Sequence, residues 1–439
     1  MPIYTSQLEV STAHPALRPS LALNFARARQ MDHRVDFTRA STAWYVDKNR
    51  LWTKAGVDQP RFTHDGKTGE SLGLYHEGTA TNNIPIHNNR ISAYKQTDNG
   101  LVVTGPDGIA NSARRMTVNS DIDTGGSTMV QANDAWGVAS GISWSIFVKV
   151  ILDDHIDFQF MDNNNNLKST RVRVYKNGGT PIIPTSSEGG DSGNGGSTTT
   201  FEEYPNGWVR IKWENFTGGI NATSYFQLYS YNHSSSDGSN VSYAYWGSQI
   251  ETTKWCTSPI LTDGAAATRS NDYAVVQSLH SPVGHFDDIY NHNGASFYID
   301  ATNHSNNTGG QYNVLHVGAN NDYGHGIFKE NGTYDIFWHI RQAGSSLANI
   351  VPSIGDWNQN MRVKIGLAYS KTNQVIYVNG GNVASSSTDS TSLTNIDRLS
   401  IGSAGNNSAP FYGTIRHVYH WASQLPSPQM QLISNEEFT

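Results

Sequence analysis

The stretch from Val363 to Gly380 restricts the fold more than any other part of the sequence. In its first half, apolar residues occupy every second position, namely Val363, Ile365, Leu367 and Tyr369. A second run, from Gln374 to Val378, leads into Asn379-Gly380. Alternation with a period of two indicates a strand with one buried face. Asn-Gly is the strongest short signal for a hairpin, because both residues accept a positive φ in a type I′ turn. The stretch therefore predicts two strands joined by a turn at Ser370–Asn373, with a hairpin turn at Asn379-Gly380 after the second strand.

The same alternation recurs elsewhere in the chain. Two strands are predicted in the middle of the sequence, with inward faces formed by Trp144, Ile146, Val148 and Val150 and by Val209, Ile211 and Trp213. A longer strand is predicted near the C-terminus, with Phe411, Ile415, Tyr419 and Trp421 on one face. Only the tail from Pro428 to Glu437 has a helical pattern.

Composition favours many short strands over helices. Charged residues make up 15% of the chain, against roughly 25% in a typical soluble domain. Long surface helices need Glu, Lys, Ala and Leu, whereas this chain is rich in Gly, Asn and Ser, which favour turns. Its 439 residues are enough for two or three domains. We therefore predict an all-β protein of more than one domain.

Charge and cysteine content limit the partners. The net charge is −7 and no basic run occurs, so we expect neither a nucleic-acid partner nor an anionic membrane surface. No apolar stretch approaches the roughly 20 residues of a spanning helix, and residues 1–20 lack the hydrophobic core of a signal peptide. Cys256 is the only cysteine, which excludes a disulfide within the chain. These features lead us to expect synthesis in a bacterial cytoplasm and release by lysis.

The C-terminal part resembles a known family. Val378-Asn379-Gly380, Ile401-Gly402 and Gly413 occur in the order and spacing found in the second half of concanavalin A-like/laminin G-like jelly rolls, which also close with a short helix. The resemblance covers about 80 residues directly. It implies a β-sandwich of this kind over residues 280–439.

The rest of the chain is similar to predicted phage tail-fibre and minor virion structural proteins. In those proteins an N-terminal segment with an FTRAST motif precedes a jelly roll that resembles carbohydrate-binding modules. The hallmarks occur here as Leu23–Ala26, Phe37–Thr42, Pro60–Phe62, Glu70–Asn82, Tyr204–Arg210, Tyr245–Glu251 and Ala267–Asp272. Ile250 and Ser248 stand where that family has Leu and Ala, without disturbing the alternation. The resemblance implies an N-terminal docking arm at residues 1–85 and a carbohydrate-binding-module-like β-sandwich at residues 86–275.

Together these features predict an all-β fold of two β-sandwich (jelly-roll) domains preceded by an extended N-terminal arm. The function we expect is that of a phage virion fibre or appendage protein that binds host-surface glycans. Such appendages are usually homotrimers, and avidity then offsets weak binding at each site. A purely structural head-decoration or tail-assembly protein without a receptor role is the alternative.

Enzymatic signatures are missing from the sequence. It has no Gly-x-Ser-x-Gly, Gly-x-x-x-x-Gly-Lys or His-Glu-x-x-His motif. Glucanases with a concanavalin-like fold carry carboxylates at alternate positions of one strand, because a period of two directs them into one cleft. No such run occurs here, so we predict a protein that is not an enzyme. A polysaccharide depolymerase with carboxylates from distant strands is the less favoured alternative.

Aromatic side chains are the predicted glycan-binding groups, because sugar faces stack on Trp and Tyr rings. The candidates are Tyr323, Trp338, Trp357 and Tyr412 in the last domain and Trp136, Tyr243 and Trp246 in the middle one. Core packing is the alternative for each of them, since a sandwich usually buries its Trp residues.

The N-terminal arm and the acidic turns supply the remaining candidates. Phe25, Phe37, Arg39 and Arg61 are the predicted arm residues for docking to other virion proteins. For the two arginines we favour a structural role, in which bonds to carboxylates or carbonyls tie the arm to the middle domain. No cofactor is expected except Ca²⁺, which the laminin G-like resemblance implies. Asp162, Asp287 and Asp288 are its weak candidates, and ordinary solvated turns are the favoured alternative.

Overall fold

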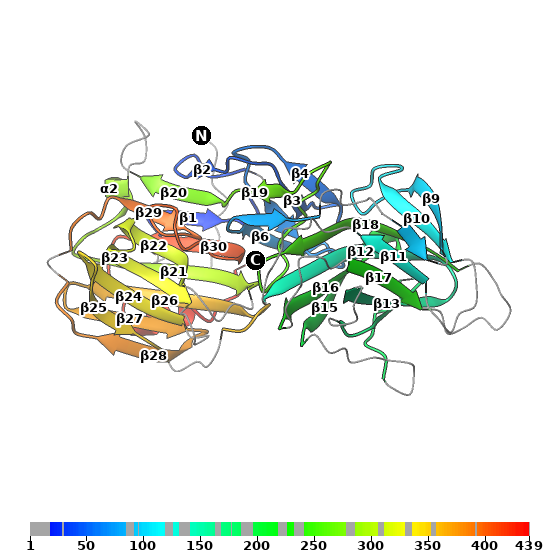
Figure 1. Ribbon diagram of the computed structural model, residues 1–439. Helices are drawn as coiled ribbons and strands as arrows, with labels where there is room; N and C mark the ends of the chain where they lie inside the picture. Colours follow the sequence, from blue (N-terminus) through cyan, green and yellow to red (C-terminus); the bar gives the residue numbers. More distant parts are fainter. Residues whose placement is uncertain are drawn as a thin grey trace.

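The computed structural model shows two β-sandwiches that lie side by side, with the first strands of the chain running along both of them (Figure 1). It describes residues 18–28, 30–84, 92–94, 96–118, 126–130, 141–162, 168–176, 178–185, 196–217, 226–231, 241–277, 286–305, 311–329, 336–352, 357–390 and 393–438. All pairings between the named strands are antiparallel. The prediction of an all-β protein with two sandwiches is confirmed.

The middle sandwich consists of a six-stranded and a five-stranded sheet. The first sheet has the order β15 (Thr198–Glu203), β16 (Val209–Phe216), β12 (Ile142–Leu152), β18 (Val241–Glu251), β10 (Ala113–Val118) and β9 (Gln96–Val103). The second has the order β14 (Val172–Tyr175), β13 (His155–Asp162), β17 (Phe226–Tyr231), β11 (Gly126–Val130) and β8 (Ser92–Tyr94). Trp144, Ile146 and Val148 of β12 point into the core between the sheets, as the alternation predicts.

The C-terminal sandwich consists of two larger sheets. One has the order β28 (Gly381–Ser386), β27 (Asn373–Val378), β26 (Arg362–Ser370), β21 (Gly294–Asn303), β30 (Gly413–Trp421), β6 (Ser71–His76) and β5 (Phe62–His64), with β1 (Leu21–Asn24) also paired to β30. The other has the order β2 (Asp36–Thr38), β20 (Tyr273–Gln277), β29 (Arg398–Ile401), β22 (Tyr312–Asn320), β23 (Tyr323–Lys329), β24 (Ile336–Gln342) and β25 (Ser345–Ile350). The predicted pairing of β26 with β27 is confirmed, with the turn between Ser370 and Asn373. Asn379 and Gly380, with φ angles of 48° and 74°, form the predicted hairpin turn and lead from β27 into β28.

β30 departs from the predicted strand with a single apolar face. Ile415 packs into the core between the sheets, whereas Tyr419 and Trp421 lie on the opposite face. The pairing with β21 skips Arg416, which forms a bulge. Because one extra residue turns every later side chain to the other face of the sheet, the prediction that Ile415, Tyr419 and Trp421 share one face is wrong.

Strands of the N-terminal segment are part of the C-terminal sandwich instead of an extended arm. β1 and β6 pair with two successive parts of β30, and β2 pairs with β20. β20 in turn pairs with β29, so residues 273–277 belong to the C-terminal sandwich and not to the middle one. Short strands satisfy their backbone hydrogen bonds by joining a larger sheet. The predicted separate arm at residues 1–85 is therefore corrected for its described part.

A hairpin from this segment covers the outer face of the middle sandwich. β3 (Ala43–Val46) pairs with β4 (Trp52–Ala55), and the hairpin packs on the face of β12 and β18 that points away from the core. Trp52 meets Phe147 edge to face with 5.7 Å between ring centroids, and Trp44 meets Trp246 in the same way at 5.7 Å. The hairpin forms a second apolar layer with this outer face. This explains why apolar residues, Phe147 and Trp246, occupy a face of the sheet that points away from the core.

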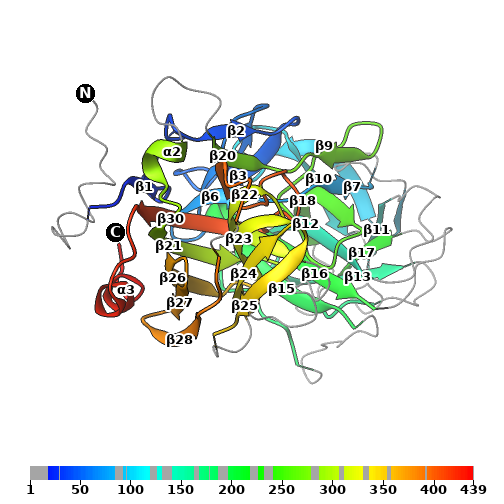
Figure 2. The ribbon, with the colours of Figure 1, turned by 90° about the vertical axis from the view of Figure 1, so that its left-hand side faces the viewer.

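The tail helix α3 (Ser427–Ile433) lies against the outer face of the sheet that contains β26 and β30 (Figure 2). Met430 and Ile433 are buried there, while Leu432 is 47% exposed. None of the helices in the described ranges has the length and apolar character that a membrane crossing requires. A two-stranded sheet of β7 (Ala80–Asn82) and β19 (Ala267–Arg269) joins the N-terminal segment to the end of the middle domain.

Candidate functional site

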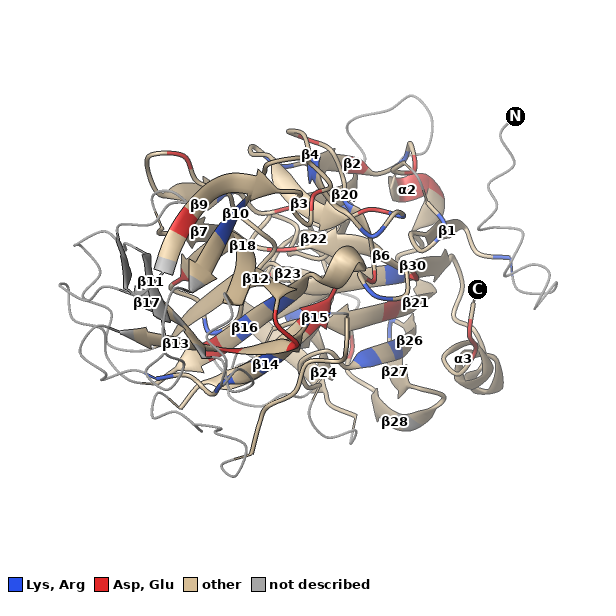
Figure 3. Cartoon of the chain, turned by 90° about the vertical axis from the view of Figure 1, so that its right-hand side faces the viewer, with Lys and Arg blue, Asp and Glu red and all other residues tan. Residues whose placement is uncertain are grey.

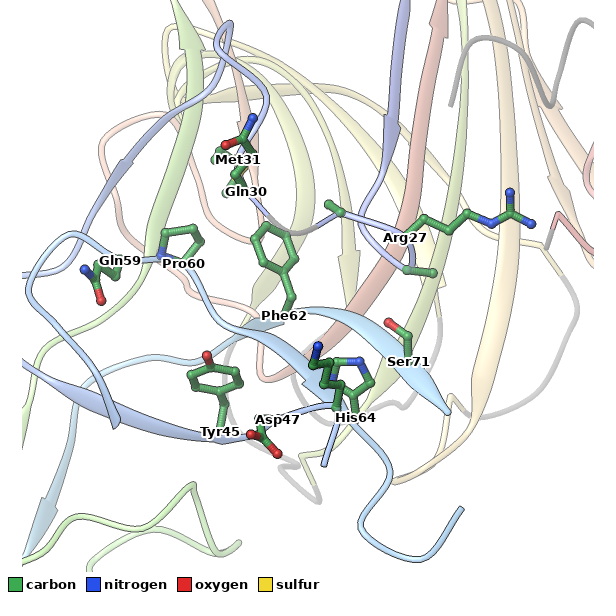
Figure 4. Close-up of a pocket in the computed structure, with 13 residues that line it drawn as sticks. Arg27, Gln30, Met31, Tyr45, Asp47, Gln59, Pro60, Phe62, His64 and Ser71 are labelled. Atoms are coloured by element: carbon green, nitrogen blue, oxygen red, sulfur yellow. The ribbon is translucent and has the colours of Figure 1, made fainter. Parts of the chain in front are cut away.

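A pocket of about 700 Å³ opens on the N-terminal segment, between the turn that follows β1 and the strands β3, β5 and β6 (Figure 4). We call it the N-terminal pocket. It is lined by Ala26, Arg27, Ala28, Gln30, Met31, Tyr45, Asp47, Lys48, Gln59, Pro60, Phe62, His64 and Ser71. Its volume lies within the range of about 300–1,000 Å³ that is usual for small-molecule sites.

The apolar floor of the pocket follows from the strand pairing. β1 ends beside β30 and brings Phe25 under the pocket, where its ring stacks on that of Phe62 with 6.3 Å between centroids. Phe62 begins β5 and is 9% exposed. Figure 4 shows its ring at the centre of the pocket, with Pro60 to one side and Tyr45 below. The C-terminal sandwich thus supports a floor built of apolar rings.

The turn at Asp47 fixes one wall. The backbone N–H groups of Asn49 and Leu51 donate to Oδ1 of Asp47 at 2.8 and 3.0 Å. This arrangement is typical of an aspartate that stabilises a turn, and it closes the hairpin of β3 and β4. Asp47 is the one carboxylate among the lining residues, and it is already occupied by the turn.

Tyr45 supplies a ring and a free hydroxyl group. Its side chain is half-buried, and its hydroxyl has no hydrogen-bond partner among the residues that the structure describes. Burial and the nearby charge of Asp47 raise the pKa of Tyr45. The hydroxyl therefore stays protonated at neutral pH and can donate to a ligand.

Polar groups with fixed orientations surround the rings. Nδ1 of His64 lies 3.3 Å from the carbonyl oxygen of Val46, and if it carries the proton, Nε2 is an acceptor. The N–H of Gly56 donates to Oε1 of Gln59 at 2.8 Å, so the amide of Gln59 keeps its two N–H donors available. Arg27 points away from Phe62 in Figure 4. The centre of the pocket therefore combines ring faces with hydrogen-bond donors and acceptors, and Lys48 also lines it.

Such a combination suits a ligand with apolar C–H faces and many hydroxyl groups. Aromatic rings provide a flat apolar surface, while amide, imidazole and phenol groups exchange hydrogen bonds with hydroxyls in both directions. Among the described lining residues no two carboxylates face each other across the pocket.

A second group of polar residues lies deep inside the molecule, where the N-terminal segment meets both sandwiches. It consists of Arg39, Arg61, Arg269, Glu77 and Asp272, all between 0% and 2% exposed. We call it the buried ion cluster. Nη1 of Arg61 donates to Glu77 at 2.7 Å, and its Nη2 donates to Asp272 at 2.5 Å. Arg39 donates to the other oxygen of Asp272 at 2.9 Å, and Arg269 lies 2.8 Å from Glu77.

The cluster keeps its carboxylates charged. Burial alone would raise the pKa of Glu77, but Arg269 and Arg61 hold it far below its ordinary value. Burial opposes the charge of Asp272 in the same way, and Arg61 leads the groups that lower its pKa. A buried ion pair is stable only with such additional partners.

The cluster gathers the hallmark motifs of the N-terminal and middle regions. Arg39 comes from Phe37–Thr42, Arg61 from Pro60–Phe62 and Glu77 from Glu70–Asn82, while Arg269 and Asp272 come from Ala267–Asp272. The predicted structural role of Arg39 and Arg61 is confirmed by their bonds to Asp272 and to the carbonyls of Gly56 and Trp44. Both arginines are enclosed by their own chain and do not reach its surface.

The two phenylalanines predicted for docking differ in exposure. Phe25 is 2% exposed and packs inside the C-terminal sandwich. Phe37 is half-buried, and the Arg39 guanidinium lies 5.6 Å from the centre of its ring. Of the predicted arm residues, Phe37 alone retains surface that another protein could contact.

Most aromatic residues predicted to bind glycan lie in the cores. Trp338 and Trp357 fill the core of the C-terminal sandwich, and Tyr243 fills that of the middle one. Trp246 lies under the hairpin of β3 and β4. Each is 0% or 1% exposed, so these four predictions are corrected: strand periodicity directs the rings inward, and the sandwich needs their volume.

The other three predicted aromatics have different positions. Tyr323 begins β23 and is half-buried, so part of its ring reaches the surface. Tyr412 packs edge to face on Trp255 with 4.8 Å between ring centroids, where the two sandwiches meet. Trp136 lies outside the described residues. The structure brings none of the described candidates into the N-terminal pocket.

The predicted metal ligands lie on two separate elements. Asp287 and Asp288 are exposed side chains of the short helix α2 (Phe286–Ile289), and Asp162 ends β13. No group of three or more His, Cys, Asp or Glu side chains within the described ranges is arranged to hold a metal ion. Ca²⁺ binding remains a prediction from the resemblance.

Sequence reasoning missed Tyr45, Phe62, His64 and Gln59 as site residues. Phe62 stands inside the Pro60–Phe62 hallmark, which offered a signal. Nothing in the alternation marks the other three, because the pocket depends on how β1, β3 and β5 meet in space.

This chain has only low similarity to known proteins, and over only part of its length. No known protein family matches the chain, and no curated protein has a matching sequence. Three solved structures are similar to parts of it, each with a TM-score of 0.30. The carbohydrate-binding module CBM40 of the Ruminococcus gnavus IT-sialidase, bound to alpha2,3 sialyllactose, is 13% identical over 36% of this chain and 91% of that one. A leech intramolecular trans-sialidase is 15% identical over 38% and 27%, and the binding domain of botulinum neurotoxin DC, in complex with rat synaptotagmin II, is 16% identical over 38% and 40%. The fold class rests on the strand pairing itself.

Proposed function

We propose that this chain is a phage virion protein that binds host-surface glycans through the N-terminal pocket. The observation that carries the proposal is that aromatic rings and hydrogen-bonding groups line one cavity. Tyr45 offers a protonated hydroxyl without a partner among the described residues, and His64 and Gln59 offer further polar atoms beside the Phe62 ring. A saccharide presents C–H faces and hydroxyls that complement both kinds of group.

The virion assignment is supported by the hallmark motifs. In the family that this chain resembles, the motifs are spread over the N-terminal segment and the following sandwich. In this chain the buried ion cluster joins charged residues from several of these motifs, namely Arg39, Arg61, Glu77 and Asp272. The motifs therefore depend on one another, because each supplies a partner for a buried charge. We take this as support for a common architecture with those proteins, made in the bacterial host and carried on the virion.

Attachment and oligomerisation complete the proposal. A homotrimeric fibre or appendage would hold several pockets close together, and avidity would then strengthen weak binding at each one. Phe37, on the edge strand β2, is the predicted docking residue that still has exposed surface for another virion protein.

A purely structural virion protein is the second candidate. It is favoured by the burial of Trp338, Trp357, Tyr243 and Trp246, because these aromatic rings serve the cores and offer nothing to a ligand. Under this alternative the N-terminal pocket would have no saccharide partner.

Glycan-array binding by the full chain, combined with competition against adsorption of the phage to host cells, separates the two candidates. The proposed function predicts that one class of host glycan is bound and that the purified chain reduces adsorption. Tyr45→Ala should lose both effects while keeping the wild-type melting temperature within a few degrees, since the Tyr45 side chain is only half-buried. Absence of binding to every host glycan would favour the structural role, and shortening of a bound polysaccharide would favour a depolymerase.

A further inference from the structure

A second pocket, of about 540 Å³, lies on the outer face of the six-stranded sheet of the middle sandwich. We call it the basic pocket. It is lined by Val102, Val103, Thr104, Arg115, Lys149, Val150, Ile151, Lys176 and Asn206. None of these residues lines the N-terminal pocket, so the two sites are built independently.

Strand register places two of the cations in one row. Arg115 of β10 and Lys149 of β12 both pair with Ala244 of β18, the strand between them. Residues paired across neighbouring strands point to the same face of a sheet, so the two side chains rise on either side of a methyl group. Adjacent strands are about 4.8 Å apart, which puts the backbones of Arg115 and Lys149 about 10 Å apart. The gap is wide enough for a small ligand group.

The hairpin of β3 and β4 covers the outer face of this sheet only as far as the position next to Arg115 and Lys149. Trp246 and Phe147 pair with each other two residues further along, and the hairpin of β3 and β4 covers them. Ala244 belongs to the same apolar layer and is 0% exposed. The basic pocket therefore begins where the cover stops, with an apolar floor and walls from Val102 and Ile151.

Within the described part of the chain, the cations of the pocket have no acidic partner. No Asp or Glu is among its lining residues. Nε of Arg115 donates to the hydroxyl of Ser242 at 2.8 Å, which fixes the direction of the guanidinium and leaves its two terminal nitrogens available. Lys149 and Lys176 form no ion pair with any residue that the structure describes. By contrast, Arg114 on the opposite face of β10 is paired with Asp98 at 2.6 Å.

Holding Lys149 in this position is unfavourable for the free protein. Its side chain is half-buried, and burial lowers its pKa because desolvation disfavours the charged form. A partly desolvated charge without a partner in a pocket is a mark of a functional site. An anionic ligand would supply the missing partner.

We infer that the basic pocket binds the acidic group of a saccharide, a carboxylate or a sulfate ester. Arg115, Lys149 and Lys176 would surround the anion, Asn206 would bind hydroxyl groups, and the apolar walls would contact the ring. The pocket recognises a single acidic sugar unit. A long polyanion such as nucleic acid is disfavoured, because the net charge is −7 and Figure 3 shows basic and acidic segments interspersed over the strands on this side.

The test measures binding of three matched probes to the full chain by isothermal titration calorimetry: a uronic acid-containing oligosaccharide, a sulfated oligosaccharide and their neutral counterpart. We expect at least one acidic probe to bind at least tenfold more tightly than the neutral one, with an affinity that falls as salt increases. The two acidic probes distinguish a carboxylate from a sulfate. Equal binding of all three probes, absence of binding by both acidic probes, or tighter binding of duplex DNA than of either acidic probe would overturn the inference.

Variants locate the binding in the basic pocket. Lys149→Met keeps the length of the side chain and removes its charge, and it should weaken acidic binding at least tenfold while raising the melting temperature slightly. Lys371→Met, which changes an exposed lysine of the C-terminal sandwich, should leave binding unchanged. Tyr45→Ala should also leave it unchanged, so failure of the N-terminal pocket and failure of the basic pocket can be told apart. Acidic binding that survives Lys149→Met would contradict the assignment.

Discussion

Arg61 and Asp272 are separated by 211 residues in the sequence, yet their Nη2 and Oδ2 atoms lie 2.5 Å apart and neither side chain reaches solvent. This contact joins the N-terminal segment to the exit from the middle sandwich, directly before β20 enters the C-terminal one. The two sandwiches and the segment that runs along them are therefore held by one set of buried charges.

Replacing Asp272 by Asn should destabilise the whole protein. The substitution removes the negative charge that Arg39 and Arg61 share. Breaking a buried ion pair by removing one partner typically costs about 3–5 kcal/mol, because the remaining charge stays buried. Urea denaturation of the variant should show this loss in the free energy of unfolding.

Glu203→Gln is the matched control for that experiment. Glu203 pairs with Lys67, whose side chain is 57% exposed, and exposed pairs contribute about 0–1 kcal/mol. Equal effects of Asp272→Asn and Glu203→Gln would show that the buried ion cluster does not hold the parts together.

Gly73 tests whether the N-terminal segment is an integral part of the C-terminal sandwich. It has a φ of +91°, and a Cβ atom there would lie 2.3 Å from the carbonyl oxygen of Ile415 in β30. Gly73→Ala therefore combines backbone strain with a clash against backbone atoms, and we expect a loss of about 2–5 kcal/mol.

Gly100 has a similar φ of +83° but has open space where its Cβ would be. Gly100→Ala should then lose only the strain contribution of about 1–2 kcal/mol. If thermal denaturation shows the two variants to be equally stable, β6 does not pack on β30 as described.

Stability should fall in mild acid because of buried histidines. His316, His325 and His420 are 1–3% exposed. Burial, which disfavours the charged form, lowers the pKa of His316 to about 4 and the pKa values of His325 and His420 to about 3. The unfolded chain binds these protons at about pH 6.5, whereas the folded chain does so only near pH 3–4. Stability is thus fully present above pH 6.5 and is lost as the pH falls through that window.

Each such histidine should reduce the free energy of unfolding by about 1.4 kcal/mol between pH 7.5 and pH 5.5. Urea denaturation at the two values measures the change. His325→Gln should reduce the pH dependence by about one histidine's share. Stability that is the same at both pH values would contradict neutral burial of these rings.

The parts of the fold that could be predicted from sequence are those set by local pattern. The pairing of β26 and β27 depends on their alternation, and the turn from β27 into β28 depends on Asn379-Gly380, so both follow from signals within a few residues of each other. In β30 the alternation predicts the buried face correctly before Arg416 but not after it, because no sequence signal marks the bulge at that residue. The place of β1 beside β30 depends on a contact across nearly 400 residues, which periodicity cannot reveal.

The candidate site was less predictable than the fold. Aromatic residues such as Trp338 and Trp357 attract attention in the sequence, but the same ring area that could bind a sugar also fills a sandwich core. Lys149 alternates with core residues along β12 and reads as ordinary surface, and only the register with Ala244 brings it near Arg115. Both pockets arise from strand pairing over long sequence distances.

The most direct test of the proposed function is the affinity of the purified chain for the host glycan that it binds, measured by isothermal titration calorimetry for the wild type, Tyr45→Ala and Tyr323→Ala. Tyr45 lines the N-terminal pocket, whereas Tyr323 is a half-buried tyrosine at the start of β23 in the C-terminal sandwich. We predict that Tyr45→Ala weakens binding at least tenfold, which corresponds to about 1.4 kcal/mol, and that Tyr323→Ala binds like the wild type. Unchanged affinity of Tyr45→Ala together with lost binding by Tyr323→Ala would contradict the account and place the site in the C-terminal sandwich.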